Sequence, residues 1–388
     1  MKITAVHAFW VHVPIPEGKR HTSDYGTLAS FDATIVRIDT DAGFTGWGEG
    51  KSAVASAANN AGLTAIVNEE FAPLLVGEDP REPARIWEML YSGTRAHYAL
   101  SRGHGFPVLN RRGAHVAAIA AVDMALWDIK GKALDEPVWR LLGGRRAPRL
   151  PAYASGGWAP AESIGEQLQG YIDRGGFRSV KMRVGAMDGS PAASARRLAA
   201  ARASLGPDIG IACDAHGTWT VAEAKRFAAL AADSAPMWFE EPVSADDKRG
   251  MAEVRAVANM AISAGESEFT RHDFRELCEL RAVDILQPDL AICGGITEAM
   301  RIAALASAYN LRLAPHLWGG APAFAAGLAV AAASPAGFIL EYSLGANPLL
   351  HELAIEGFPV EDGMIDVPDR PGLGITIDEG FVARYAVG

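Results

Sequence analysis

The sequence has few cysteines, no excess of positive charge and no long uninterrupted apolar run. Its three cysteines show no paired spacing, which argues against a disulfide framework and favours a reducing compartment. A net charge of -10 gives nucleic-acid binding no electrostatic support. The alanine-rich stretch 321–338 is interrupted by two prolines and does not predict a membrane span. We therefore expect a cytoplasmic protein with neither nucleic-acid nor membrane partners.

The first third of the chain predicts a small domain of mixed structure. A length of 388 residues, with 49% hydrophobic and 21% charged residues, allows two ordinary globular domains. Residues 2–13 and 31–48 have strand character, and the second range predicts a hairpin that turns near residues 41–43. Apolar residues at helical spacing predict three helices, at residues 53–70, 81–93 and 114–130.

From residue 150 onward, short apolar runs alternate with alanine-rich helical stretches. The runs are LPAYASG, SVKMRVG, IGIACD, MWFEEP, AISAGE, VDILQPD, LRLAPH and GFILEY. Eight such strand and helix units predict a β/α barrel whose last helix is short or irregular. The active site of this fold lies at the carboxyl ends of its strands. Polar residues that end the runs are therefore the candidates for chemistry.

Three consecutive runs end in an acid. Asp214, Glu240 and Glu266 follow one another at intervals of 26 residues. About 30 residues make one βαβ unit, so the three carboxylates should meet at one end of neighbouring parallel strands. Hard oxygen ligands at three convergent points suit a divalent cation such as Mg²⁺. Three unrelated surface acids are the alternative, and the equal spacing makes it the weaker one.

The other strand ends carry a cationic pair, an acid, a histidine and a second acid. These are Lys181 with Arg183, then Asp289, His316 and Glu341. An aspartate hydrogen-bonded to the histidine of the next strand would fix its tautomer and raise its basicity, which makes a general base. A base beside a metal and a lysine suits removal of a proton next to a carboxylate, because both cations stabilise the resulting ene-diolate.

His216 is two residues beyond Asp214, so strand alternation would place both side chains on the same face. It is a candidate acid for loss of a β-hydroxyl, with a supporting hydrogen bond to a metal ligand as the alternative. Arg183 cannot readily act as a second base, because a guanidinium holds its proton far above neutral pH. Together these residues favour β-elimination of water.

Two polar segments are candidates for substrate recognition, at residues 18–26 and 91–112. The second is equally compatible with a solvated loop or with a positive lid over an anionic ligand. The candidate side chains are His21, Tyr25, Arg95, His97, Arg102 and His104.

The ordered motifs VKMR, ACDAHG, FEEP, SAGES, QPD, GGIT, APH and LEY, preceded by GWGEG and VDMALWDIKGKAL, resemble the mandelate racemase branch of the enolase superfamily. The resemblance covers nearly the whole chain. It implies an α+β capping domain at residues 1–125, a modified (β/α)7β TIM barrel at residues 126–360, and a tail, residues 361–388, that returns to complete the cap.

The resemblance also implies site roles. It implies one Mg²⁺ per subunit, held by Asp214, Glu240 and Glu266, and an Asp289–His316 dyad. It makes Glu341 the hydrogen-bond donor to the substrate carboxylate, provided that its surroundings keep it protonated. Members of the branch are often dimers or octamers, so a homo-oligomer is expected.

Within that branch the chain is similar to acid-sugar dehydratases, because they share its Asp-Ala-His sequence at residues 214–216. The expected reaction is removal by His316 of the proton α to the carboxylate, followed by His216-assisted loss of the β-hydroxyl. Its product is a 2-keto-3-deoxy sugar acid. One alternative is a racemase or epimerase of a 2-hydroxy acid that uses Lys181 and His316 on opposite faces. Another is a sugar-acid binding protein without turnover.

Overall fold

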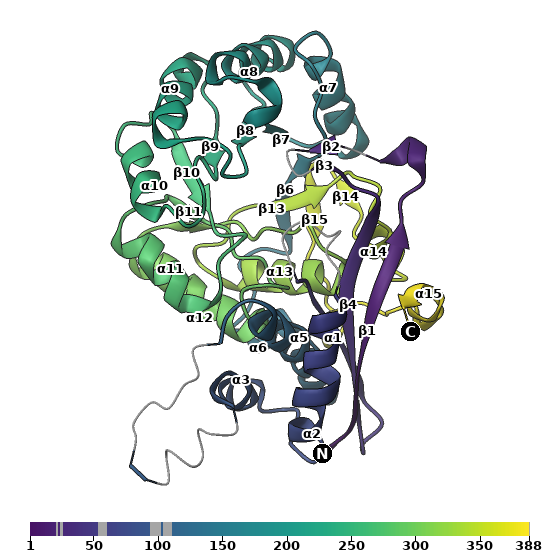
Figure 1. Cartoon of the computed structure of the whole chain (residues 1–388). Coiled ribbons are helices and arrows are strands. Elements are labelled where there is room, and N and C mark those ends of the chain that lie inside the picture. The colour runs from purple at the N-terminus through teal and green to yellow at the C-terminus, as the bar shows by residue number, and fades with distance from the viewer. Residues whose placement is uncertain (21, 24–25, 53–59, 94–101, 104–110, 388) are drawn as a thin grey trace.

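The computed structural model describes residues 1–20, 22–23, 26–52, 60–93, 102–103 and 111–387. It contains an N-terminal cap domain and a larger α/β barrel, and Figure 1 shows the two packed together.

The cap is built on an antiparallel sheet in the order β16-β1-β4-β5. Strands β4 and β5 form the hairpin that the sequence predicts, with its turn at residues 41–44. Alternation along β1 buries Val11 and Val13 and leaves His12, between them, more exposed. The strands of this sheet and of a small ribbon beside it are β1 (Ile3–Pro14), β4 (Ser30–Thr40), β5 (Thr45–Gly50), β16 (Ala386–Val387), and β2 (Thr22–Ser23) paired with β3 (Gly26–Thr27).

Helices pack against this sheet, and the longest of them, α5, contacts both β4 and β5. The predicted helices at 81–93 and 114–130 are confirmed as α3 and α5, and α5 extends four residues further than predicted. Of the predicted helix at 53–70, the first seven residues lie outside the described ranges. The helical segments of the cap are a 3₁₀ turn (Glu17–Lys19), α1 (Ala61–Ala65), a π-helical segment (Ile66–Phe71), α2 (Ala72–Leu75), α3 (Pro83–Ser92) and α5 (Ala114–Leu134).

The barrel contains a strand at each of the eight predicted apolar runs. Successive strands pair in parallel from β6 to β12, and β13 pairs with β6 on the other side. An isolated parallel bridge joins Leu313 of β12 to Gly337, three residues before β13 begins. The strands are β6 (Arg149–Ser155), β7 (Ser179–Arg183), β8 (Gly210–Asp214), β9 (Trp238–Glu240), β10 (Ala261–Ala264), β11 (Ile285–Leu286), β12 (Arg312–Leu313) and β13 (Leu340–Ser343).

One helix follows each strand from β6 to β12. Side chains cap the starts of α8, α9 and α10, and Thr220 and Glu223 form a reciprocal capping box at the start of α9. These helices are α7 (Ile164–Gly175), α8 (Pro191–Leu205), α9 (Val221–Ala231), α10 (Lys248–Arg255), α11 (Thr270–Glu279), α12 (Gly295–Ala308) and α13 (Ala321–Ala333). Shorter helical segments are α6 (Val138–Leu141), α14 (Pro348–His351), and 3₁₀ turns at Ala186–Asp188 and Ala232–Ser234.

In the described part of the chain, none of these helices combines the length and the apolar character needed to cross a bilayer.

The C-terminal tail contacts both parts of the molecule. Strand β15 (Met364–Asp366) pairs with β6 of the barrel and with β14 (Val360–Glu361). Helix α15 (Glu379–Tyr385) then leads to β16, which pairs with β1 of the cap. The expected boundary after residue 125 falls inside α5, a continuous helix that packs on β5 of the cap and on α12 of the barrel.

The GWGEG motif lets β5 lie directly on α5. Gly46, Gly48 and Gly50 face the backbone carbonyls of that helix, and a Cβ built on Gly48 would lie 1.9 Å from the carbonyl oxygen of Ala121. Real Cβ atoms do not approach an oxygen so closely, so only glycine fits without moving the helix. This contact fixes the position of the residues at the end of β5.

Gly48→Ala is therefore expected to destabilise the protein by about 1–3 kcal/mol, because the added methyl group overpacks the β5–α5 contact. The matched control is Gly62→Ala in α1, where a Cβ meets no atom within 4 Å. That change should be neutral or slightly stabilising, since alanine has the higher helix propensity. Thermal denaturation midpoints of the two variants test this, and equal midpoints would contradict the packing argument.

Candidate active site

The three acids that the sequence predicts as metal ligands lie together at the carboxyl ends of three neighbouring strands. Asp214 ends β8 and Glu240 ends β9, and the two are register partners in the sheet. Glu266 lies two residues beyond β10. One carboxylate oxygen from each lies within 4.8 Å of the others, and all three side chains are buried. Hard oxygen donors at this separation suit a divalent cation, and this donor set fits Mg²⁺.

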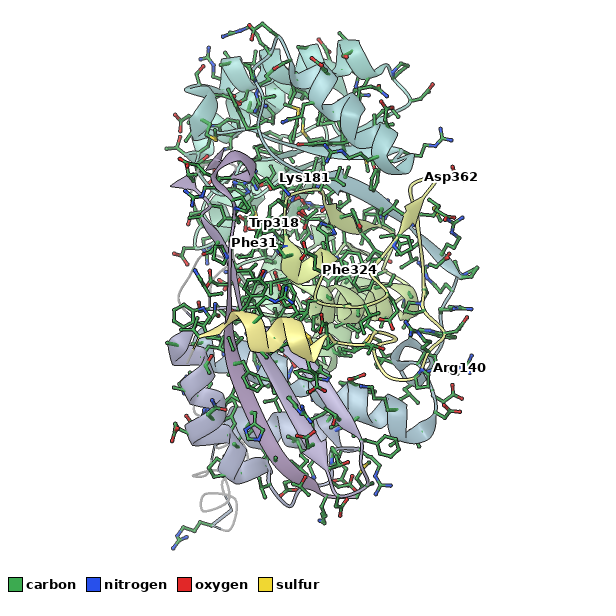
Figure 2. All side chains as sticks on the ribbon, turned by 90° about the vertical axis from the view of Figure 1, so that its right-hand side faces the viewer. Phe31, Arg140, Lys181, Trp318, Phe324 and Asp362 are labelled. Atoms are coloured by element: carbon green, nitrogen blue, oxygen red, sulfur yellow. The ribbon has the colours of Figure 1, made fainter. Side chains whose placement is uncertain are left out.

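Lys181 is the middle residue of β7 and lies in the interior of the molecule (Figure 2), with its ammonium group directed at this cluster. Its Nζ is 2.7 Å from Glu240 Oε1, 3.2 Å from Asp214 Oδ2 and 3.0 Å from Glu341 Oε1. Burial lowers the pKa of Lys181, but the surrounding carboxylates outweigh it and raise that pKa well above its usual value. Lys181 is therefore a firmly protonated cation within the acidic cluster.

Burial and the neighbouring charges shift the pKa values of Glu240 and Asp214 in opposite directions. Burial raises the pKa of Glu240 to about 7, although Lys181 opposes the change. Burial also tends to raise the pKa of Asp214, yet His216 and Lys181 hold it well below its usual range. The contrast follows from where the charges lie: Asp214 faces His216, Lys181 and Arg183, whereas Glu240 has Lys181 as its cation and three carboxylates around it. Negative charge is therefore in excess on the Glu240 side of the cluster. A dication is the partner that would relieve it.

His316 and Asp289 form the predicted dyad. They are bridge partners where β11 and β12 continue in parallel, and His316 Nδ1 lies 2.7 Å from Asp289 Oδ2. The other ring nitrogen, Nε2, points to the acid cluster and lies 3.7 Å from Glu266 Oε2. Burial lowers the pKa of His316, but the neighbouring carboxylates raise it to about 9. The geometry is that of an imidazole oriented by an aspartate, with Nε2 facing the cluster.

Glu341 lies between Lys181 and His316 and contacts both side chains. Its Oε2 accepts a hydrogen bond from the Leu317 amide at 3.0 Å, and Lys181 lies beside Oε1. Burial raises the pKa of Glu341, but Lys181 and His316 lower it to about 2. In this arrangement Glu341 is a carboxylate that accepts hydrogen bonds, and its role as a donor to a substrate carboxylate stays a prediction.

His216 reaches Asp214 by a route that differs from the prediction. Strand β8 ends at Asp214, and His216 has a positive φ of 46°, so a turn rather than strand alternation sets its direction. Its Nε2 lies 3.1 Å from Asp214 Oδ2. Arg183 Nη1 lies 3.0 Å from Nδ1 and 2.7 Å from Nε2 of the same ring. The imidazole therefore lies between a guanidinium and a carboxylate.

Two cavities adjoin these groups. One of about 570 Å³ is lined in part by His216, Glu241 and Lys248. The other, of about 790 Å³, is lined in part by Trp318 and Arg20, and Trp318 also lies under the Arg183 guanidinium at 5.6 Å. Each cavity is large enough for part of a sugar-sized ligand.

The predicted substrate-binding residues of the polar segments are not placed here. His21, Tyr25, Arg95 and His97 lie outside the described residues, as does His104, and Arg102 lies on the exposed surface.

Sequence reasoning missed Lys51. It follows β5 of the cap, and its Nζ lies 2.8 Å from Asp289 Oδ2 and 3.1 Å from the Trp318 carbonyl oxygen. The available signal was a charged pair, Glu49 and Lys51, at the end of a glycine-rich strand with buried neighbours. A buried lysine requires a partner, although the sequence does not say which one.

Comparison with known proteins matches two family descriptions in order. Residues 5–143 match the mandelate racemase / muconate lactonizing enzyme N-terminal domain, and residues 163–381 match the enolase C-terminal domain-like family.

Two relatives and one solved structure illustrate the match. D-galactarolactone cycloisomerase of Agrobacterium fabrum is 32% identical over 99% of each chain. D-galactonate dehydratase of Ralstonia nicotianae is 36% identical over 90% of this chain and 89% of its own length. The structure of a racemase from Streptomyces coelicolor with bound magnesium is 30% identical, covers 99% of this chain and 100% of its own, and superposes with a TM-score of 0.86. This chain therefore belongs to the mandelate racemase and muconate lactonizing enzyme branch of the enolase superfamily, whose members are metal-dependent enzymes.

Proposed function

We propose that this enzyme is a Mg²⁺-dependent acid-sugar dehydratase that yields a 2-keto-3-deoxy sugar acid. The observation that carries the proposal is the placement of two different proton-transfer groups around one acid cluster. His316, oriented by Asp289, lies at the Glu266 side, and His216 lies at the Asp214 side next to Arg183. Relatives named D-galactonate dehydratase and arabinonate dehydratase support the substrate class.

Asp214, Glu240 and Glu266 would hold the metal, one ion per subunit. A bound Mg²⁺ would act as a Lewis acid that stabilises negative charge on the substrate carboxylate. Lys181 would add a second positive charge at the same carboxylate. In the expected (β/α)7β barrel, which the seven strand and helix pairs support, the three acids lie at strand ends or just after them, and Lys181 lies within β7 two residues before its end.

His316 would begin the reaction. The neighbouring carboxylates raise the pKa of His316 to about 9, and a dication held by Asp214, Glu240 and Glu266 would oppose that rise. With Nδ1–H donated to Asp289, Nε2 would then be unprotonated and could take the proton from the carbon next to the carboxylate. The electron pair of that C–H bond moves toward the carboxylate and then forms the double bond that expels the β-hydroxyl. His216 would protonate the departing hydroxide to give water, and the resulting enol becomes the 2-keto acid by gaining a proton at the β-carbon and losing the proton of its own hydroxyl group.

The racemase alternative has weaker support. It needs a base on the face opposite His316, and Arg183 cannot readily lose its proton. Lys181 is the remaining candidate, and its ammonium group is in contact with three carboxylates that keep it protonated. Exchange of the α-proton with inversion and without a keto product would favour the alternative.

The proposed reaction depends on a bound metal, so removing the metal should stop it. Chelation with EDTA should abolish keto-acid formation from acid sugars, and added Mg²⁺ should restore it. A hundredfold excess of Mg²⁺ over its Kd should also stabilise the fold by about 2.7 kcal/mol, because the ion binds only the native site. Thermal shift and a keto-acid assay measure both effects. Undiminished turnover in EDTA would rule out the metal role.

A second prediction concerns the base. His316→Asn should lower kcat by about 10²–10⁴-fold, because the α-proton then has no acceptor. Mg²⁺ affinity, measured by calorimetry, should change little because the carboxylates remain. Wild-type turnover in this variant would refute the assignment of His316.

A third prediction separates the two steps. His216→Asn should still exchange the substrate α-proton for deuterium in D₂O, while keto-acid formation falls by about 10²-fold or more. Proton NMR of the substrate follows the exchange. Loss of exchange and elimination together would instead indicate that His216 positions Asp214.

A further inference from the structure

We propose that Lys51 is a positioning residue for the catalytic base: an ammonium group supplied by the cap domain that holds Asp289 as the fixed, charged acceptor for His316. Lys51 follows the last strand of the cap sheet, whereas Asp289 and His316 belong to the barrel. The side chain of Lys51 is 1% exposed, so its charge faces the dyad and not the solvent.

Both oxygens of Asp289 are occupied in a way that fixes the carboxylate plane. Oδ1 accepts a hydrogen bond from the Ala291 amide at 2.8 Å. Oδ2 accepts from Lys51 Nζ at 2.8 Å and from His316 Nδ1 at 2.7 Å. The ammonium and the imidazole therefore share one oxygen atom. Removing the ammonium frees one lone pair of that oxygen and removes the constraint on the direction of the bond to His316.

The charge of Lys51 bears on the tautomer of the base. Burial raises the pKa of Asp289, but Lys51 and His316 lower it to about 2. A carboxylate can only accept the hydrogen bond, so in the neutral imidazole it keeps the one proton on Nδ1, and Nε2 is the nitrogen that carries the lone pair. A protonated Asp289 could donate to Nδ1 instead, which would place the imidazole proton on Nε2 and block proton abstraction. A buried carboxylate without its cationic partner moves toward that state.

The end of β5 is anchored to the barrel at several points around this contact. The backbone amide of Lys51 donates to the Ala291 carbonyl at 3.2 Å. Glu49, on the same strand, accepts from the amides of Gly320 and Ala323 at 2.7 and 3.2 Å. Docking of the cap thus delivers the ammonium to a fixed place. Glu49 makes a comparable buried contact across the same interface, and its hydrogen bonds go to Gly320 and Ala323, away from the dyad. Its charge also acts on Lys51 and Asp289, so Glu49→Gln controls for both interface packing and the loss of a nearby buried charge.

The experiment compares Lys51→Met with Glu49→Gln in the full-length enzyme with Mg²⁺. Its kinetic arm rests on the proposed function. Lys51→Met should lower kcat about 10–100-fold with KM changed less than about twofold, the range typical of partners that orient active-site ligands. Glu49→Gln should lower the denaturation midpoint but keep kcat within about threefold. Lys51→Arg, which keeps the charge, should recover part of the loss.

A second arm does not need a substrate. The hydrogen-bonded Nδ1 proton of His316 should give a downfield ¹H NMR signal, identified by its absence in His316→Asn. Lys51→Met should shift or broaden this signal, and Glu49→Gln should leave it in place. If Lys51→Met does not fold, Lys51→Gln, an uncharged hydrogen-bond donor, takes its place in both arms.

The outcomes separate the two proposals. A changed signal in an enzyme that dehydrates no acid sugar would uphold the role of Lys51 and reject the proposed function. An unchanged signal, or equal losses of kcat in the Lys51 and Glu49 variants, would overturn the role of Lys51, because interface packing alone would then account for the effect.

Discussion

Negative charge buried at the mouth of the barrel is the constraint on which the rest of the structure depends. Four carboxylates of the barrel meet there, and Asp289 lies beside them. Removing an ion from water costs several kcal/mol unless an opposite charge or hydrogen bonds replace the solvent. Two buried ammonium groups, Lys181 and Lys51, supply part of that compensation. The remaining negative charge lies where Asp214, Glu240 and Glu266 converge, which is where a dication would be held.

The two lysines come from different parts of the fold. Lys181 belongs to the barrel and faces the metal-type acids, whereas Lys51 belongs to the cap and faces the dyad. The position of Lys51 depends on β5, and β5 depends on glycines that lie against the carbonyls of α5. Packing of small residues in the cap is therefore connected to the orientation of a side chain in the barrel. The cap thus places a charged group in contact with the dyad of the barrel.

The sequence predicts what repeats along the chain. One βα unit per strand places Asp214, Glu240 and Glu266 at the same end of the barrel, and the same rule brings Asp289 to His316. It does not predict contacts between parts that share no repeat. Lys51 and Asp289 meet only because the cap docks on the barrel, and no spacing in the sequence encodes that docking. His216 shows a smaller limit, because its direction follows from a positive φ in a turn and not from strand alternation.

The asymmetry of the site is the argument for elimination over inversion. Inversion at carbon requires two groups that can each give and take a proton, one on each face. Here one side carries an imidazole held by an aspartate, and the position two residues beyond Lys181 carries Arg183. A guanidinium contributes charge and directed hydrogen bonds but not a basic lone pair. Its contact with His216 places it beside a second imidazole, which is the better proton carrier on that side. A base on one side and an imidazole supported by a fixed cation on the other suit the loss of a proton and a hydroxide from adjacent carbons.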